Sequence, residues 1–461
     1  MRVKPTVFRM YDIRGIADED ITEEFAYHLG RAFGSWVVER GGHRVVVGQD
    51  VRPHSGKYRE ALIRGLMDTG LAVQDLGTVP TPLMYFALFQ LPDIHGGIQV
   101  TASHNPREYN GFKMNIGQDT VYGEMIQALR ARMEQENYVR PAQGGSRTSV
   151  DIVSPYLDWV NQNLDASVDF PVGVDTGNGT AGPVMEALFQ RFQVPYRGLY
   201  LEPEGTFPHH LPDPTVVKYM QDLIHLVTRE GLALGLGLDG DADRLGVVTH
   251  DGELLFGDKI LGIFARDVLE RNPGATIIFD VKCSQGLIEY IQRLGGKPLM
   301  WKTGHSLLKV KLKETGAPLA GEMSGHIFFK DRFFGYDDAI YAAFRLLEIL
   351  KKTGKTLREL ADEIPTYFST PEIRVGCPDD RKFEVVQQVI RDFKEQGYEV
   401  IDIDGARVQF ADGFGLIRAS NTQPVLVVRC EGKTEEARDR ICETLKAELQ
   451  RFPEVDLSAM P

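Results

Sequence analysis

Hydrophobic positions recur with two spacings along the first 365 residues, and the two spacings alternate. Short apolar runs that end in aspartate occur at Val45–Asp50, Val172–Asp175 and Ile277–Asp280, and their β-branched residues predict buried strands. Each run is followed by a segment with apolar residues at helical spacing. These expected helices cover residues 55–69, 183–192 and 284–294. The succession of strand, helix and strand at three places predicts three copies of one α/β unit.

Each copy continues in the same way, with a second helix and a further strand that runs into a polar loop containing glycine. The second helices are expected at residues 82–90, 215–230 and 305–314, and the loops at 101–104, 239–244 and 321–326. Other helices are expected at residues 22–40, 123–136, 258–270 and 336–352. The repeat predicts equivalent corners for the three loops, and open α/β sheets bind ligands beyond the carboxyl ends of their strands.

The pattern changes after Ile364–Pro365. Strand-like alternation is found at residues 399–404, 406–410 and 424–429, and a helix is expected at 434–451. This order is typical of an α+β domain, which would act as a lid or clamp on a site made by the other three. We expect domains at residues 1–148, 149–251, 252–365 and 366–461, with 137–148 as a linker rich in Gly, Gln, Arg and Pro.

Composition narrows the possible classes of protein. A chain of 461 residues corresponds to three or four domains at roughly 150 residues each, and 43% hydrophobic with 25% charged residues is typical of globular proteins. The net charge of −13 argues against nucleic acid and anionic membranes as partners. No apolar run reaches the ~18 residues of a membrane span, and the first residues lack a signal-peptide core. We expect a cytoplasmic protein, a monomer or weak dimer, whose four separated cysteines are reduced.

The loop at Thr101–Pro106 carries the first chemical signal. Ser103 and His104 follow the strand-like run Gly96–Val100, and Lys113 returns a positive charge ten residues after Ser103. Serine, histidine, asparagine and proline are also ordinary turn residues, so a surface turn remains an alternative. The other interpretation is an activated or phosphorylated serine.

Three aspartates at alternate positions form the second signal. Asp239, Asp241 and Asp243 follow an apolar strand, and oxygen ligands alone favour Mg²⁺ over zinc or copper. An EF-hand is excluded because Arg244 and His250 stand where Gly and Glu are required. The glycine pattern that begins at Gly235 is not a dinucleotide fingerprint, because a strand and no helix follows it. A solvated acidic turn remains the alternative.

Two further loops are weaker alone, and each also fits a plain turn. Residues 321–326 place Glu322, Ser324 and His326 between glycines, which suits hydrogen bonds to sugar hydroxyls. Residues 418–422 place Arg418 with Ser420, Asn421 and Thr422 before a strand, and arginine grips phosphate bidentately. Other charges are candidates by position: Arg14, Lys282, Lys302 and His305.

Taken together, these motifs resemble the α-D-phosphohexomutases over essentially the whole chain. Four loops of that family occur in its order and spacing. Glu322-Met-Ser-Gly-His326 and Arg418-Ala-Ser-Asn-Thr422 are similar to the bacterial phosphomannomutase/phosphoglucomutase branch. They differ from the Glu-Gln-Ser-Gly-His and Ser-Gly-Thr sequences of phosphoglucosamine mutases. The resemblance implies three similar α/β domains, with mixed sheets between helices, and a smaller C-terminal α+β domain around a central cleft.

The resemblance also implies roles for individual residues. Ser103 would be phosphorylated, and Asp239, Asp241 and Asp243 would bind Mg²⁺ together with an oxygen of that phosphoserine. Groups near the transferring phosphate would be Arg14, His104, Lys113 and Arg244, with Lys113 or a neighbour assisting proton transfer. Substrate would be bound by ten residues: Tyr11, Lys282, His305, Glu322, Ser324, His326, Arg418, Ser420, Asn421 and Thr422. Among these, Glu322 and Ser324 would hold sugar hydroxyls, and the group around Arg418 would hold the non-reacting phosphate.

The implied reaction moves a phosphoryl group between the 1- and 6-positions of mannose or glucose phosphate. It passes through a hexose 1,6-bisphosphate, so glucose or mannose 1,6-bisphosphate would be intermediate and activator. Because that intermediate must bind in two orientations, a movable fourth domain is expected. The alternatives are a phosphoglucosamine mutase, a metal-dependent phosphosugar phosphatase and a non-catalytic phosphosugar-binding protein. The sequence does not rank mannose against glucose.

Overall fold

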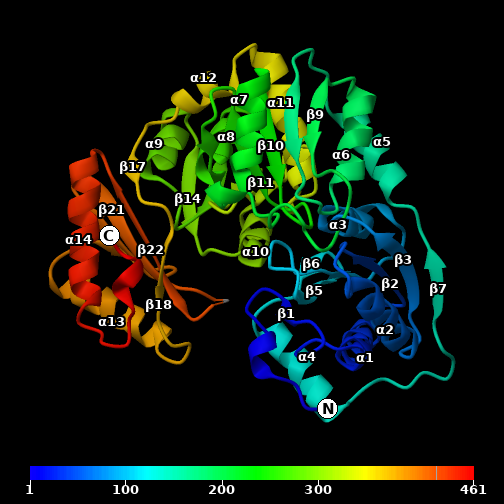
Figure 1. Ribbon diagram of the computed structural model, residues 1–461. Helices are drawn as coiled ribbons and strands as arrows, with labels where there is room; N and C mark the ends of the chain where they lie inside the picture. Colours follow the sequence, from blue (N-terminus) through cyan, green and yellow to red (C-terminus); the bar gives the residue numbers. More distant parts are fainter. Residues whose placement is uncertain (422) are drawn as a thin grey trace.

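The structure is a computed structural model that describes residues 1–421 and 423–461. Three α/β units follow one another in an arc, and a fourth unit, orange to red in Figure 1, lies beside the third. Each of the four units contains its own β-sheet. The predicted fold class, three similar α/β domains with mixed sheets and a C-terminal domain of a different build, is confirmed.

The first unit is built on a sheet with strand order β1-β5-β4-β2-β3-β7, and β6 pairs with β5. Its strands are β1 (Ile13–Ile16), β2 (Arg44–Gln49), β3 (Ala72–Thr78), β4 (Gly96–Val100), β5 (Tyr109–Ile116), β6 (Asp119–Thr120) and β7 (Ser146–Ser149). Its helices are η1 (Pro5–Val7), α1 (Glu23–Glu39), α2 (Ser55–Met67), α3 (Thr81–Gln90) and α4 (Glu124–Gln135). Helix α1 begins where predicted, because the Thr22 hydroxyl accepts the Phe25 N–H and caps its first turn.

The second and third units repeat this plan with shorter sheets. The second contains β8 (Val172–Asp175), β9 (Tyr196–Leu199), β10 (Leu234–Leu238), β11 (Leu245–Thr249), β12 (Leu254–Leu255), α5 (Val153–Asn163), α6 (Gly182–Phe192), η2 (Val217–Met220) and α7 (Gln221–Glu230). The third contains α8 (Gly257–Arg271), β13 (Thr276–Asp280), α9 (Gln285–Arg293), β14 (Lys297–Trp301), α10 (His305–Thr315), β15 (Leu319–Gly321), β16 (Ile327–Phe329), α11 (Ala339–Thr353) and α12 (Leu357–Asp362).

All three sheets share a four-stranded core, and this core places the loops of interest. Its strands run in the order β5-β4-β2-β3, β11-β10-β8-β9 and β16-β15-β13-β14. In each unit the inner strands pair in parallel, and the last core strand returns antiparallel to its predecessor. The Ser103, Asp239 and Glu322 loops therefore join the same two core strands in each of the three copies, as the repeat predicted.

The fourth unit is an antiparallel sheet with two long helices. Its strands are β17 (Phe368–Ser369), β18 (Ile373–Gly376), β19 (Val400–Ile401), β20 (Ala406–Phe410), β21 (Gly413–Ala419) and β22 (Val425–Gly432). The helices are α13 (Lys382–Glu395), α14 (Glu435–Leu449) and η3 (Leu457–Ala459). The sequence pattern missed α13 and β21 in this unit, and it missed α5 and α12 elsewhere.

Three predicted segments differ from the structure. The linker prediction for residues 137–148 is wrong at its end, because Ser146–Ser149 forms β7 and Arg147 binds Asp75 of β3 and Glu60. The helix predicted from Thr215 begins with an Asp213-capped turn and η2, and α7 starts only at Gln221. The strand predicted at 399–404 is reduced to Val400–Ile401. Within the described residues, no helix has both the length and the apolar character needed to cross a membrane.

Candidate active site

Ser103 lies just past β4 in a tightly held turn. Its backbone φ is 51°, a left-handed conformation that non-glycine residues adopt at a cost of about 1–3 kcal/mol. The Ser103 N–H donates to Thr101 Oγ1 at 2.9 Å. The Ser103 hydroxyl donates to Asp239 Oδ2 at 2.8 Å and lies 3.1 Å from His104 Nδ1. The loop of the first unit therefore presents its hydroxyl to the acidic loop of the second.

A buried arginine that the sequence pattern missed supports this turn. Arg52 donates to the carbonyl oxygens of Ser103 and Asn105, and to those of Pro106 and Tyr109. Asp50 ends β2 and accepts from Arg52 Nε at 3.1 Å and from Thr101 Oγ1 at 2.8 Å. The aspartate at the end of the strand was a visible signal, but nothing in the spacing pointed to Arg52.

The three aspartates form one compact buried group. Asp239, Asp241 and Asp243 are fully buried, and each offers an oxygen within 4.8 Å of the others. Burial raises the pKa of Asp239, and the neighbouring Asp243 and Asp241 raise it further. Within the described residues, Asp241 Oδ1 is buried without a hydrogen-bond partner. Oxygen-only ligands and an unpaired buried carboxylate oxygen fit a hard divalent cation such as Mg²⁺.

Lys113 lies on β5, opposite this group, and not in the Ser103 loop. Its ammonium donates to Asp241 Oδ2 at 2.7 Å and also to Asp243 Oδ2. Burial alone would lower the pKa of Lys113, but attraction to Asp241 and Asp243 outweighs it and raises the pKa. Lys113 in this arrangement stays protonated and acts as a hydrogen-bond donor to the two carboxylates, not as a base.

Three more predicted residues surround Ser103. Burial lowers the pKa of His104, and Arg244 and Arg14 lower it further, so its imidazole is neutral at pH 7. Arg14 donates to Asn105 Oδ1 at 2.6 Å and forms an ion pair with Asp12. The backbone N–H of Arg244 donates to Asp239 Oδ1 at 3.0 Å, and the Arg244 side chain donates from Nε to His326 Nε2 at 3.4 Å. The guanidinium groups of Arg14 and Arg244 are both close enough to His104, next to Ser103, to lower its pKa, and guanidinium groups can bind a phosphoryl group.

The third loop is joined to the acidic group through a histidine. His326 Nε2 lies 3.2 Å from Asp243 Oδ1, and His326 Nδ1 lies 2.6 Å from Glu322 Oε2. Burial opposes the charge, but Asp243 and Glu322 raise the pKa of His326 to about 9. Ser324 Oγ donates to Glu322 Oε2 at 3.3 Å. Glu322 and Ser324 are thus on one side of the acidic group and Ser103 is on the other.

His305 begins helix α10 in the same region. Its Nδ1 has no hydrogen-bond partner in the described part of the chain, and it lies 3.7 Å from the unpaired Oδ2 of buried Asp337. Lys309 donates to the other oxygen of Asp337 at 3.0 Å. The sequence pattern did not single out Asp337 or Lys309, because Asp337 lies in the loop between β16 and α11, outside the three repeated loops, and Lys309 lies within α10.

The residues around Arg418, predicted to hold the non-reacting phosphate, belong to the fourth unit. Arg418 lies on β21 and donates from Nε to Asp404 Oδ2 at 3.1 Å, and Asp404 Oδ2 also accepts the Thr303 N–H at 2.9 Å. The Asn421 amide donates to the Tyr11 hydroxyl, which donates to the Thr303 carbonyl at 2.5 Å. Loops of the first, third and fourth units therefore meet at Tyr11.

Three more residues were predicted to bind this phosphate, and the structure describes two of them. The Ser420 hydroxyl accepts the Gln423 N–H at 3.2 Å, and Lys282 forms an ion pair with Glu372 at 3.2 Å. Thr422 lies outside the described residues. The predicted site residues that the structure describes lie in the loops of Ser103, Asp239, Glu322 and Arg418 or on segments next to these loops. A path of contacts joins the Ser103 loop to Arg418: Asp239, Asp243, His326, Glu322, Gly304, Thr303 and Asp404.

Comparison with known proteins extends the resemblance to the whole chain. Four family models of phosphoglucomutase/phosphomannomutase match in order: domain I at residues 5–140, domain II at 154–252, domain III at 256–368 and the C-terminal domain at 372–448. A Pseudomonas aeruginosa phosphomannomutase/phosphoglucomutase is 45% identical over 96% of both chains. A Neisseria gonorrhoeae phosphoglucomutase is 43% identical over 97% of both.

A solved structure gives the same result for the fold. The phosphoglucomutase/phosphomannomutase family protein from Burkholderia thailandensis superimposes with a TM-score of 0.92 at 41% identity, over 98% of each chain. The predicted enzyme class, a phosphohexomutase, is confirmed. The chain belongs to the phosphoglucomutase/phosphomannomutase family, the bacterial type of the α-D-phosphohexomutases.

Proposed function

We propose that the protein reversibly transfers a phosphoryl group between the 1- and 6-positions of glucose or mannose phosphate, with Ser103 as the carrier. The observation that carries this proposal is the 2.8 Å hydrogen bond from Ser103 to Asp239. A serine hydroxyl in a strained turn beside a buried carboxylate group is arranged to hold a phosphoryl group next to a divalent cation. The names of the relatives support glucose and mannose phosphates as substrates.

The cation in this proposal is Mg²⁺, held by Asp239, Asp241 and Asp243. When bound, it would offset negative charge on the transferring phosphoryl group. Lys113 would offset the charge of Asp241 and Asp243, and Lys113 or a neighbouring group would assist proton transfer. Arg14 and Arg244 would bind equatorial oxygens of the same group.

The sugar would lie between this group and the fourth domain. Glu322 and Ser324 offer oxygens to its hydroxyls, and the imidazoles of His326 and His305 lie next to them, with ring centroids 5.6 Å apart. Arg418, Ser420, Asn421 and Thr422 would hold the phosphate that is not reacting, with Lys282 and Tyr11 on either side. We expect glucose or mannose 1,6-bisphosphate to form, to turn end for end, and to phosphorylate Ser103 again.

The test is a set of coupled assays with purified protein. Glucose 1-phosphate, mannose 1-phosphate and glucosamine 1-phosphate are supplied separately, each with Mg²⁺ and a trace of glucose 1,6-bisphosphate. We expect conversion of the first two to their 6-phosphates. Conversion of the glucosamine ester alone would favour a phosphoglucosamine mutase, and release of inorganic phosphate would favour a phosphatase. Binding without turnover would contradict the proposal.

A further inference from the structure

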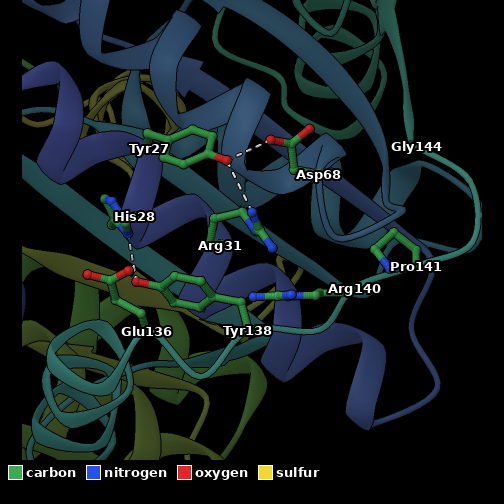
Figure 2. A pocket seen from close by; sticks show the side chains of 9 residues that line it. All are labelled: Tyr27, His28, Arg31, Asp68, Glu136, Tyr138, Arg140, Pro141 and Gly144. Atoms are coloured by element: carbon green, nitrogen blue, oxygen red, sulfur yellow. Dashed lines mark hydrogen bonds between the residues drawn. The ribbon is translucent and has the colours of Figure 1, made fainter. Parts of the chain in front are cut away.

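A second pocket lies in the first unit, away from the loops described above. Its volume is about 570 Å³, within the range of small-molecule sites. Figure 2 shows its lining side chains, which come from helix α1, from the end of α2 and from the segment between α4 and β7. They are Tyr27, His28, Arg31, Asp68, Glu136, Tyr138, Arg140, Pro141 and Gly144. None belongs to the candidate active site.

Arg31 is fixed in this pocket by its neighbours. Its guanidinium donates to the Tyr27 hydroxyl at 3.1 Å and to the Val139 carbonyl at 3.3 Å. The guanidinium carbon lies 5.2 Å from the centre of the Tyr138 ring, a cation–π distance. Arg31 Nε is buried and has no acceptor in the described part of the chain. The local structure therefore holds this cation in place but leaves it incompletely satisfied.

A second guanidinium in the pocket has no partner. In the part of the chain that the structure describes, Arg140 has neither a hydrogen bond nor an ion pair. Figure 2 shows its side chain pointing toward the ring of Tyr138, and Arg31 lies against the same ring. The acidic residues are already engaged, since Asp68 accepts from Tyr27 at 2.7 Å and Glu136 from the Met1 amine at 2.6 Å. Glu136 is paired with the Met1 amine and Asp68 accepts only from a neutral hydroxyl, so two guanidinium groups stand against one unpaired carboxylate. The excess positive charge in the pocket favours an anion.

The combination of charges and rings indicates what kind of anion fits. Two arginines suit a phosphate or diphosphate, because guanidinium groups bind phosphate oxygens in pairs. The tyrosine rings can pack against a planar ring of the ligand, and the carboxylates of Asp68 and Glu136 can accept from ligand hydroxyls. We propose that this pocket binds a nucleoside phosphate. None of the residues that line this pocket is bonded to Ser103, so a ligand bound here would be an effector and not a substrate.

The test uses adenosine diphosphate as the probe and isothermal titration at about 0.15 M salt, with the intact protein. We expect saturable binding that saturating glucose 1-phosphate does not displace. Arg140→Ala removes an exposed, unpaired side chain and should raise the Kd at least about tenfold. Arg31→Gln, which keeps one donor, should also raise the Kd, with folding checked by circular dichroism.

The matched control is Arg229→Ala, an exposed arginine in the second unit that lines neither site. Its Kd should equal that of the wild type. The proposal is overturned if no saturable binding occurs, if glucose 1-phosphate displaces the probe, or if Arg140→Ala binds as well as the wild type. Equal affinity for inorganic phosphate or glucose 6-phosphate would also overturn it, because the nucleoside would then contribute nothing.

Discussion

The first three units are joined in a different way from the fourth. One hydrophobic cluster runs through the first three and includes side chains from α3, α5, α6, α8 and α11. The fourth unit has a separate core between its sheet and its helices. Among the described residues, a small apolar cluster bridges it to the third: Val281, Phe414 and Leu416, with Met300 and Ile403 packed against them.

Polar contacts also cross the junction between the third and fourth units. Buried Arg407 donates to the carbonyls of Val281 at 2.5 Å and Cys283 at 2.9 Å, and Arg429 donates to the carbonyl of Lys282 at 2.5 Å. Glu431 accepts from the Gln285 N–H at 2.8 Å. These bonds hold the segment that carries Lys282 against the fourth unit.

The first three units share an apolar core, whereas the fourth is attached by hydrogen bonds and a small apolar cluster, and these two kinds of interaction differ in strength. Separating an apolar core exposes its area at about 25 cal/mol per Å², whereas each hydrogen bond from a charged group that is exchanged for water changes the free energy by about 1.5–3 kcal/mol. We therefore expect the first three units to behave as one body and the fourth to rotate against it more easily. Ser103 and the acidic group belong to the first three units, and Arg418 belongs to the fourth.

The largest expected effect is at Ser103, in the first three units. Ser103→Ala removes the carrier of the phosphoryl group, so turnover should fall by several orders of magnitude in a coupled assay. Intact-mass analysis should find phosphate on the wild type and none on the variant. The control is Ser458→Ala, an exposed serine near the C-terminus, which should retain normal turnover. Near-normal turnover of Ser103→Ala would refute the carrier role.

Asp241→Asn tests the acidic group with the next largest effect. It removes one anionic ligand while keeping the size of the side chain, so Mg²⁺ affinity should fall by about ten- to a hundred-fold. Titration calorimetry with Mg²⁺ measures this directly, and excess Mg²⁺ should restore part of the activity. An unchanged Mg²⁺ affinity would mean that the three carboxylates form only a buried polar group.

Arg418→Ala tests whether the fourth unit binds substrate. Loss of a charge-assisted contact of about 1.5–3 kcal/mol should lower kcat/KM by about ten- to a hundred-fold, mainly through KM. The effect should be equal for glucose 1-phosphate and mannose 1-phosphate, because both carry the same phosphate. Glu322→Gln is the comparison variant, and its effect should differ between the two sugars. Unchanged kinetics of Arg418→Ala would remove the fourth unit from substrate binding.

The smallest effect concerns stability at the junction of the second and third units. Asp338 caps α11 and accepts from the Tyr156 hydroxyl of α5 at 2.8 Å, and burial raises its pKa from 3.8 to about 7. Between these two values the unfolded chain releases a proton that the folded protein keeps. The folded state therefore loses stability as pH rises from about 4 to 7, by on the order of 2–4 kcal/mol.

Asp338→Asn keeps the size and the hydrogen-bonding groups but does not titrate. Its free energy of unfolding, from urea denaturation, should depend less on pH than that of the wild type, with the greatest gain above pH 7. The same pH dependence in both proteins would show that Asp338 does not stay protonated in the folded state.

Local patterns predicted the repeat and most of the site. Strand-ending aspartates and glycine-bearing loops are short-range signals, so the loops at Ser103, Asp239 and Glu322 could be recognised from the sequence. Arg52, Asp337 and Asp404 could not, because their partners are distant in the chain. Arg52 binds Ser103 at a separation of 51 residues, Asp337 binds Lys309 at 28, and Asp404 binds Thr303 at 101. Strand β7 was missed for the same reason, since its polar sequence is stabilised by pairing with β3 and by the bonds of Arg147 to Asp75.

The boundaries proposed for the four domains and the roles of individual residues remain predictions. The contact path from Ser103 to Arg418 supports the roles by bringing these residues together. A single-turnover experiment tests transfer through Ser103 most directly. Protein labelled with ³²P at Ser103 is mixed with unlabelled glucose 1-phosphate and quenched at successive times. We expect the label to leave the protein and appear in glucose 1,6-bisphosphate and then in glucose 6-phosphate. Label that stays on Ser103, or that appears only as inorganic phosphate, would contradict the account.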